Sequence, residues 1–319
     1  MSLEFGIVFI LLWMLQIVYF KIADKYNIID KPNQRSSHSQ LTLRGGGIIF
    51  PISFLLWFFV SGFQYPYLAA AVVLLSTISF VDDVMTLSTK PRLTIHLLSV
   101  GLTLYELGFE LLPWWAWILG FVLVIGWLNA FNFMDGINGI TVLYALSVIL
   151  PLGFLNYQTP TVDQDLYVYI CLGLLVFGFF NVRRKAKTFA GDIGSISLGL
   201  LLVFCLISLI LATGDWFYVV FVAVYGIDSV ITIMERILRK ENIFEAHRSH
   251  LYQYLANEKG IPHVRVSVLY ALIQFSVSSV LIYSIPFEMG NQVAVIILLS
   301  LGLLYLYVKK SVKSSFSIE

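Results

Sequence analysis

The chain has 319 residues, of which 59% are hydrophobic and 12% are charged, and its mean hydropathy is +0.85. A soluble domain of this size carries roughly 25% charged residues, so this composition excludes a soluble globular protein and indicates a polytopic membrane protein. The net charge of +1 hides a strong asymmetry and by itself says nothing about partners; we expect no nucleic-acid partner. Cys171 and Cys205 both lie in apolar runs and predict no disulfide framework.

Apolar runs bounded by charge, proline or polar clusters predict the membrane spans, because a helix needs about 20 apolar residues to cross a bilayer. Lys21 and Lys25 follow the first run and no basic residue precedes it, so we expect a retained span with its N-terminus outside, not a cleaved signal peptide. We predict one all-α polytopic domain over 1–319 with a periplasmic N-terminus and a cytoplasmic C-terminus. Its eleven expected spans are 5–20, 46–62, 67–81, 93–109, 113–129, 137–156, 166–182, 193–213, 216–234, 266–286 and 291–308.

The basic residues are distributed on one side of this predicted topology. With the N-terminus outside, every segment that carries Lys or Arg faces inside, as the positive-inside rule requires. The longest inner loop, 236–265, is expected to be a cytoplasmic substrate-binding loop. All twenty Lys and Arg residues fall within 21–44, 90–92, 183–187, 236–265 and 309–313.

Two adjacent carboxylates, Asp82 and Asp83, end the third predicted span at the inner interface. A desolvated acidic pair beside a bilayer is costly unless a cation neutralises it. The pair therefore predicts a cation or phosphate site, and a solvated helix end is the alternative.

Oxygen-bearing side chains crowd the junction between the fifth and sixth predicted spans, at Asn129, Asn132, Asp135 and Asn138. The first three recur at every third residue, so a helical end would place them near one face. Hard oxygen ligands suit Mg²⁺ or Mn²⁺ bound together with substrate phosphates. A purely structural Asn/Gly turn is the alternative.

Asp192 opens the eighth predicted span, directly after a basic run that ends at Lys187. A glycine-rich helix start can bind phosphate through its free N–H groups, although a simple N-cap is the favoured local alternative for Asp192. Arg44 precedes three glycines in a segment that could form an anion-facing lid or an ordinary loop. The intramembrane carboxylate Asp228 is either functional or bonded across helices.

The longest inner loop contains His247, Arg248 and His250. A zinc site would need a third ligand, and neither a cysteine nor a further histidine is near enough to supply it. Imidazoles and a guanidinium beside an acidic metal centre instead suit phosphate or nucleotide recognition. A solvated basic loop is the alternative.

Five motifs in this order resemble those of the polyprenyl-phosphate N-acetylhexosamine-1-phosphate transferases, or glycosyltransferase family four. They are Arg44-Gly-Gly-Gly47, Phe80-Val-Asp-Asp83, Asn129-Ala-Phe-Asn132-Phe-Met-Asp-Gly136, Ala190-Gly-Asp192-Ile-Gly-Ser195 and His247-Arg-Ser-His250. The resemblance implies a helical bundle in the bacterial inner membrane with a cytoplasmic active site. It also implies transfer of a sugar-1-phosphate from a UDP-N-acetylhexosamine to undecaprenyl phosphate, with release of UMP, to initiate surface polysaccharide or O-antigen synthesis.

The family pattern implies a role for each matching residue. Asn132 and Asp192 would hold Mg²⁺, for which Mn²⁺ could substitute. Asp82, Asp83 and Asp135 would form the catalytic centre, in which Asp82 or Asp83 would position or deprotonate the lipid phosphate. The residues expected to contact substrate are Arg44, Arg92, Asn138, Lys187, His247, Arg248 and His250.

The chain departs from familiar members at two places. Asn138 stands where many carry a second Asp, and Leu251 to Gln253 replace the further histidines of the muramoyl-pentapeptide branch. We therefore expect UDP-GlcNAc or a related nucleotide sugar as donor. A homodimer is left open. The alternative of another class is a secondary transporter, but transporter sites lie near the midplane, whereas these carboxylates crowd the inner interface.

Overall fold

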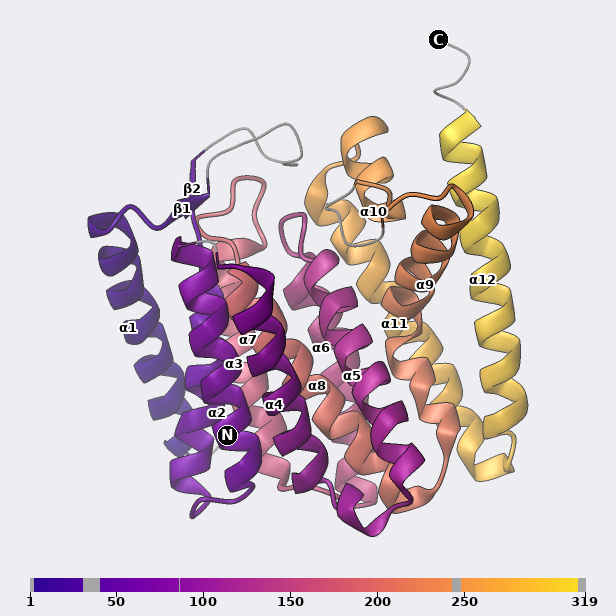
Figure 1. Cartoon of the computed structure of the whole chain (residues 1–319), viewed down its shortest axis with the longest axis horizontal. Coiled ribbons are helices and arrows are strands. Elements are labelled where there is room, and N and C mark those ends of the chain that lie inside the picture. Colours follow the sequence, from indigo (N-terminus) through magenta and orange to yellow (C-terminus); the bar gives the residue numbers. More distant parts are fainter. Residues whose placement is uncertain (1–2, 31–40, 86, 243–247, 315–319) are drawn as a thin grey trace.

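A computed structural model describes residues 3–30, 41–85, 87–242 and 248–314, which form a bundle of long helices (Figure 1). A helix lies at each of the predicted spans. These helices are α1 (Leu3–Lys25), α2 (Ile49–Val60), α3 (Pro66–Met85), α4 (Thr89–Glu106), α5 (Trp114–Phe133), α6 (Ile140–Gln158), α7 (Gln164–Asn181), α8 (Gly191–Thr213), α9 (Ala223–Leu238), α11 (His263–Ser284) and α12 (Gly290–Ser314).

Nine of the described helices are long and apolar enough to cross a membrane, which confirms a polytopic helical membrane protein. Two predicted spans are not among the nine. The α2 helix, even with the 3₁₀ turn η1 (Gly46–Ile48) before it, is short, and α4 carries Lys90, Arg92 and Glu106. The number of eleven spans and the orientation of the termini stay predictions.

Short elements complete the fold between the helices. Strands β1 (Ile29–Asp30) and β2 (Thr42–Leu43) form an antiparallel hairpin in which Ile29 pairs with Leu43. Leu43 also forms a parallel bridge with Thr188, so the hairpin is tied to the loop that precedes α8. The remaining elements are η2 (Phe109–Leu111), η3 (Trp216–Val222), α10 (Leu251–Gln253), η4 (Tyr254–Glu258) and η5 (Ile285–Phe287).

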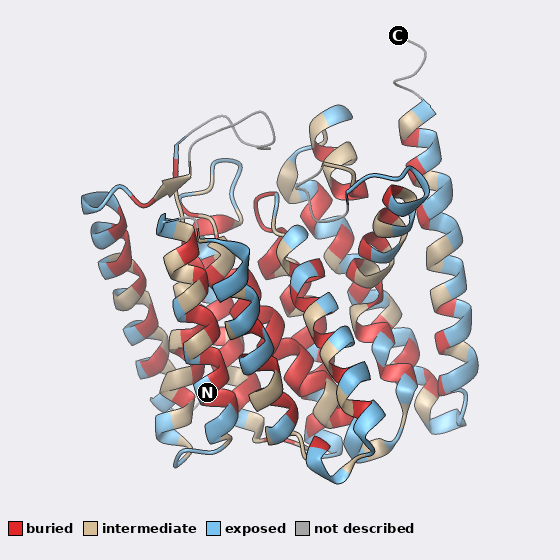
Figure 2. Cartoon of the chain, viewed as in Figure 1, coloured by how far each residue is buried: buried red, intermediate tan, exposed pale blue. Residues whose placement is uncertain are grey.

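The core lies in the centre of the bundle, where α6, α7 and α8 are mostly buried, whereas α1 and α12 expose most of their surface (Figure 2). The exposed residues of these flanking helices are largely apolar, for example Ile10 and Leu303. Large exposed apolar faces on long helices suit a lipid environment. The apolar faces are exposed because the runs that form these helices are hydrophobic on every side of the helix.

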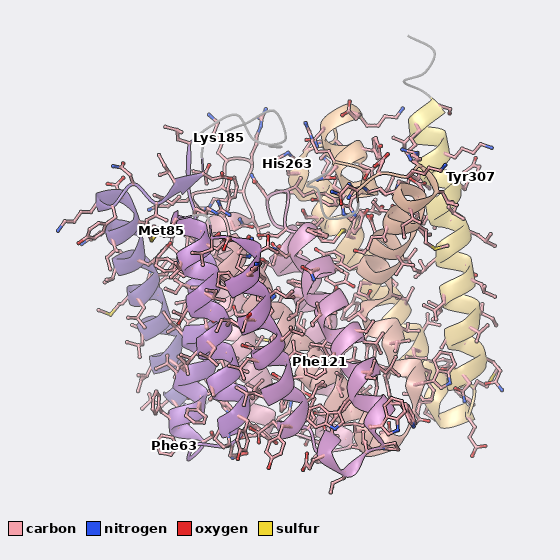
Figure 3. All side chains as sticks on the ribbon, in the orientation of Figure 1. Phe63, Met85, Phe121, Lys185, His263 and Tyr307 are labelled. Atoms are coloured by element: carbon pink, nitrogen blue, oxygen red, sulfur yellow. The ribbon has the colours of Figure 1, made fainter. Side chains whose placement is uncertain are left out.

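The hairpin, the 183–190 loop, the α5–α6 turn, α10 and the C-terminal ends of α3, α9 and α12 lie at one end of the bundle (Figure 1). Met85, Lys185 and His263 are at this end, and Phe63 is at the opposite one (Figure 3). The described segments that carry Lys and Arg gather here, so we call it the basic end. Which membrane face it occupies stays a prediction.

Candidate active site

Asp83, near the end of α3, joins three parts of the basic end. Its buried carboxylate lies 2.8 Å from Nε of Arg44 and accepts backbone N–H bonds from Asp192 (3.0 Å) and Ile193 (3.1 Å). These N–H groups belong to the first turn of α8, where a helix has unsatisfied donors and the positive end of its dipole. The structure therefore gives the predicted catalytic carboxylate Asp83 an anchoring position, with partners on both oxygens.

Glycines permit this close approach. Gly191 has a positive φ of 70°, and a Cβ there would overlap the Asp83 carboxylate. A Cβ on Gly47 or on Gly194 would likewise overlap the backbone of the other. Gly46 and Gly47 also donate backbone bonds to the chain before α8. The two glycine motifs are thus packed against each other, and the described part of the Arg44 segment is docked into the fold.

Asp82, Asp192 and two arginines extend this arrangement into a network. Asp82 lies 2.8 Å from Nη1 of Arg92 and accepts a 2.6 Å bond from the backbone of Leu87. The carboxylate of Asp192 is farther from its arginines, at 3.7 Å from Arg44 and 3.9 Å from Arg92. Its side chain also stays 19% exposed. We call the set Asp82, Asp83, Asp192, Arg44 and Arg92 the carboxylate–arginine network.

The C-terminal end of α5 places further polar side chains beside Asp192. Asn132 bonds to the Asp192 side chain, and its Oδ1 accepts a 3.0 Å bond from the Ser195 hydroxyl. Asp135 follows in the α5–α6 turn and accepts a bond from the Thr141 hydroxyl. Burial raises the pKa of Asp135 from its usual 3.8 to about 6. The structure therefore brings the predicted residues Asn132 and Asp192 together.

This donor set can be tested against the implied metal. No group of three or more His, Cys, Asp or Glu able to hold a metal occurs within the described ranges. Mg²⁺, however, is commonly bound by one or two carboxylates together with substrate phosphates, not by an all-protein cage. Asp192, with its partly exposed carboxylate next to the Asn132 amide, fits a metal that arrives with a diphosphate.

The segment 248–253 reaches the same region from the long inner loop. The Tyr252 hydroxyl donates a 2.9 Å bond to the carbonyl of Phe133, and a Cβ on Gly136 would overlap that hydroxyl. Arg248 lies close enough to act electrostatically on Tyr252. His250 is buried, with Nδ1 2.8 Å from Asp228. His247 lies outside the described residues.

Two predicted substrate-binding residues have other partners. The Asn138 amide donates to the backbone carbonyls of Arg183 (2.9 Å) and Arg184 (3.3 Å), which ties the α5–α6 turn to the loop before α8. The ammonium of Lys187 lies 4.7 Å from the centre of the Phe20 ring, beside α1. Among the described contacts, neither side chain joins the carboxylate–arginine network. Their expected contact with substrate stays a prediction.

Asn181 was not singled out by the sequence analysis, although it supports the site. Its Oδ1 accepts the backbone N–H of Gly139 at 2.8 Å, and its Nδ2 donates to Thr188 at 2.9 Å. It therefore fixes both the α5–α6 turn and the strand-like approach to α8. A single polar residue at the end of an apolar run was the available signal, and nothing in the run identified its partners.

The fold and the site define a polytopic membrane protein with acidic and arginine side chains alternating at one end. A model for glycosyl transferase family 4 matches residues 65–210, which include Asp82, Asp83, Asn132 and Asp192. Three of the five motifs lie within this match, so the resemblance to the family is confirmed over this part of the chain, and the chain is related to the family.

Curated proteins give the same result. The chain is 26% identical over 293 residues to a probable undecaprenyl-phosphate N-acetylglucosaminyl 1-phosphate transferase of Bacillus subtilis, covering 83% of the chain and 80% of that protein. It is 28% identical over 282 residues to an undecaprenyl-phosphate alpha-N-acetylglucosaminyl 1-phosphate transferase of Yersinia pestis, covering 80% and 76%. A phospho-N-acetylmuramoyl-pentapeptide-transferase of Streptococcus pyogenes is 30% identical over 182 residues, covering 50% and 52%.

Proposed function

We propose that the protein transfers GlcNAc-1-phosphate, or the 1-phosphate of a related N-acetylhexosamine, from a UDP-sugar to undecaprenyl phosphate and releases UMP. The observation that carries this proposal is the partly exposed Asp192 carboxylate, which lies beside Asn132 and within 4 Å of two arginines. Such a group of charges suits the meeting of two anionic phosphates. The relatives named for undecaprenyl-phosphate transferases support the choice of acceptor and of sugar.

The reaction is a phosphoryl transfer. An oxygen of the lipid phosphate forms a bond to the β-phosphorus of the UDP-sugar, and the bond from this phosphorus to the bridging oxygen breaks. The bridging oxygen leaves with UMP, and the sugar becomes linked to the lipid through a diphosphate. The nucleophile is already ionised at neutral pH, so the protein mainly needs to position the phosphates and neutralise their charge.

Asp192 and Asn132 would hold Mg²⁺, or Mn²⁺ in its place, against the diphosphate. The metal would supply charge neutralisation and polarisation of phosphoryl oxygens. Arg44 and Arg92 each contact one carboxylate at 2.8 Å and Asp192 at a longer distance. A substrate phosphate can replace the longer contacts without breaking the short ones, because guanidinium groups bind phosphate in the same manner as carboxylate.

In this scheme Asp82 and Asp83 hold the arginines in place. Asp83 has partners on both oxygens, and Asp82 is bound to Arg92 and to the backbone of Leu87. We therefore assign both carboxylates to the positioning of Arg44 and Arg92. Arg248, at the edge of the same region, would contact the nucleotide sugar. The reaction would take place at the cytoplasmic face of a bacterial inner membrane, where it would initiate surface polysaccharide synthesis.

One assay tests this function. Purified protein is incubated with undecaprenyl phosphate, Mg²⁺ and a panel of UDP-N-acetylsugars, and UMP release is followed. We expect UMP with UDP-GlcNAc or a close relative, and only when the lipid phosphate is present. A folded preparation that releases UMP from none of the sugars would contradict the proposal, and uptake of a sugar nucleotide into proteoliposomes would instead favour the transporter alternative.

A further inference from the structure

A second polar cluster lies apart from the carboxylate–arginine network, between α9, α11 and α12. At its centre is Asp228 of α9, which is fully buried. One carboxylate oxygen accepts a 2.8 Å bond from the Tyr270 hydroxyl, and the other accepts a 3.0 Å bond from the Tyr305 hydroxyl. The reaction proposed above assigns no task to this carboxylate, so its place in the fold requires another explanation.

The charge of a buried carboxylate must be balanced, because leaving it alone in a membrane protein is costly. His250 provides a close polar partner, with Nδ1 2.8 Å from Asp228. Lys309 of α12 provides a cation through Thr232, whose hydroxyl accepts a 2.8 Å bond from the ammonium and lies 3.4 Å from the carboxylate. Asp228 is therefore held by groups from three helices and from the 248–253 segment.

The contact between Asp228 and His250 orients both the imidazole ring and the backbone around it. A carboxylate at Nδ1 places the proton on that nitrogen and sets the orientation of the imidazole. The backbone N–H of Leu251 also points to Asp228, at 3.4 Å, and the backbone N–H of His250 donates to Gln253 at 3.2 Å. The Asp228 carboxylate thus contacts both the imidazole and the backbone at the first turn of α10 and fixes the orientation of this turn.

This turn is also connected to the candidate active site. Tyr252, two residues after His250, donates to the carbonyl of Phe133, the residue that follows Asn132. The rings of Phe133 and His250 lie 6.4 Å apart. Asp228 and the end of α5 therefore hold the same short segment from two sides. Arg248 lies two residues before His250, so its position depends on both contacts.

We infer that Asp228 is a positioning residue for the sugar-nucleotide donor, acting through His250 on the segment 248–252. This inference rests on the proposed function. The donor is water-soluble and reaches the site from the aqueous side, where this segment lies at the end of the bundle. The lipid acceptor enters from the bilayer. Loss of the Asp228 charge should therefore weaken donor binding and leave acceptor binding nearly unchanged.

Steady-state kinetics of Asp228→Asn test the inference. We expect KM for the UDP-sugar to rise about tenfold or more, the scale known for losing the hydrogen-bond partner of a metal-bound histidine, while KM for undecaprenyl phosphate changes by less than about twofold. Asp163→Asn is the matched control, because Asp163 caps α7 at the opposite end of the bundle. Equal changes in both KM values, or no change in either, would overturn the inference.

A second measurement needs no turnover. The Ser249 hydroxyl is buried, so a cysteine placed there by Ser249→Cys should react slowly with a maleimide. Adding Asp228→Asn should raise the labelling rate about tenfold, because the segment loses its anchor and opens locally. Asp228→Asn without the new cysteine corrects for labelling of Cys171 and Cys205.

Unchanged labelling of the double variant would overturn the inference, whatever the kinetics show. If the wild-type protein releases no UMP from any sugar, the proposed function has failed, and the labelling still decides whether Asp228 holds the segment. The two failures are therefore distinguishable. Increased labelling together with a selective rise in KM for the donor supports both.

Discussion

The three carboxylates at the ends of α3 and α8 are chemically alike and differ in what their oxygens contact. Asp83 is buried with partners on both oxygens, and Asp82 is paired with Arg92 at 2.8 Å. Asp192 keeps an exposed edge and only long contacts to arginine. A carboxylate can exchange a long contact for a metal or phosphate at lower cost than a short buried one, so Asp192 is the best candidate for binding the reacting groups.

Replacing Asp192 by Asn should lower kcat at least about 100-fold, the usual scale for losing a group that stabilises charge in a transition state. The Mg²⁺ concentration needed for half-maximal rate should also rise. UMP release at a series of Mg²⁺ concentrations measures both effects. Asp165→Asn, an exposed change at the opposite end of the bundle, serves as control. Near-normal activity of Asp192→Asn would show that Asp192 does not bind the reacting groups.

Asp135 provides a pH prediction. Burial raises its pKa to about 6, so the folded protein keeps a proton that the unfolded chain releases near 3.8. The stability from this proton is fully present below about pH 4 and is lost as the pH rises through about 6. The carboxylate forms only above about pH 6, and we expect kcat to fall below that pH if ionised Asp135 takes part. The phosphate substrate also titrates in this range, so the pH profile of kcat must be compared between the wild-type protein and Asp135→Asn. If the two profiles are the same, Asp135 does not take part in the reaction.

Between elements, the critical contact is the approach of η1 and α2 to the N-terminus of α8. Gly47 and Gly194 face each other without side chains, and Gly191 turns the chain so that two N–H groups reach Asp83. The two glycine motifs therefore form one packing unit that places Arg44 beside Asp192. A lid formed by the described part of the Arg44 segment is not what this geometry shows.

Gly191→Ala should destabilise the protein by about 1–3 kcal/mol, because a non-glycine residue at positive φ is strained and its Cβ would displace the Asp83 carboxylate. Gly302→Ala is a matched control in α12, where nothing lies within 4 Å of an added Cβ. Thermal unfolding in detergent measures the difference. A Gly191→Ala variant as stable as Gly302→Ala would mean that the α3–α8 contact tolerates a shift.

At the scale of the whole molecule, the basic segments and the site share one end of the bundle (Figure 1). The carboxylate–arginine network, the α5–α6 turn and the 248–253 segment come from parts of the chain that are more than 200 residues apart. The long apolar helices bring them together, and the exposed apolar faces of α1 and α12 are suited to the surrounding lipid.

The predicted orientation can be measured in intact cells with a membrane-impermeant maleimide. We expect Glu110→Cys to be labelled from outside and Lys185→Cys to be protected until the membrane is permeabilised, because lysine and arginine favour the cytoplasmic side. Both positions are exposed and lie at opposite ends of the bundle. The reverse labelling pattern would place the candidate active site outside the cytoplasm.

The class of protein and the location of its helices follow from the amino-acid sequence alone. Long apolar runs have few structural solutions in a bilayer, because every backbone polar group must be bonded within a helix or a closed barrel. The motifs with Asp192 and Asn132 could also be found, because amide and carboxylate groups are rare in such runs. Each predicted span therefore contains a helix, and the family resemblance was visible before any contact was known.

Which of these residues face one another depends on how the helices pack in three dimensions. Asp83 and Asp192 are 109 positions apart, and Asp228 and His250 are 22 apart. Hydrophobic periodicity does not encode such pairings, since the packing of helices determines them. For this reason Asn138 and Lys187, which are predicted to contact substrate, have partners that the sequence did not reveal, and so do Asp228 and Asn181.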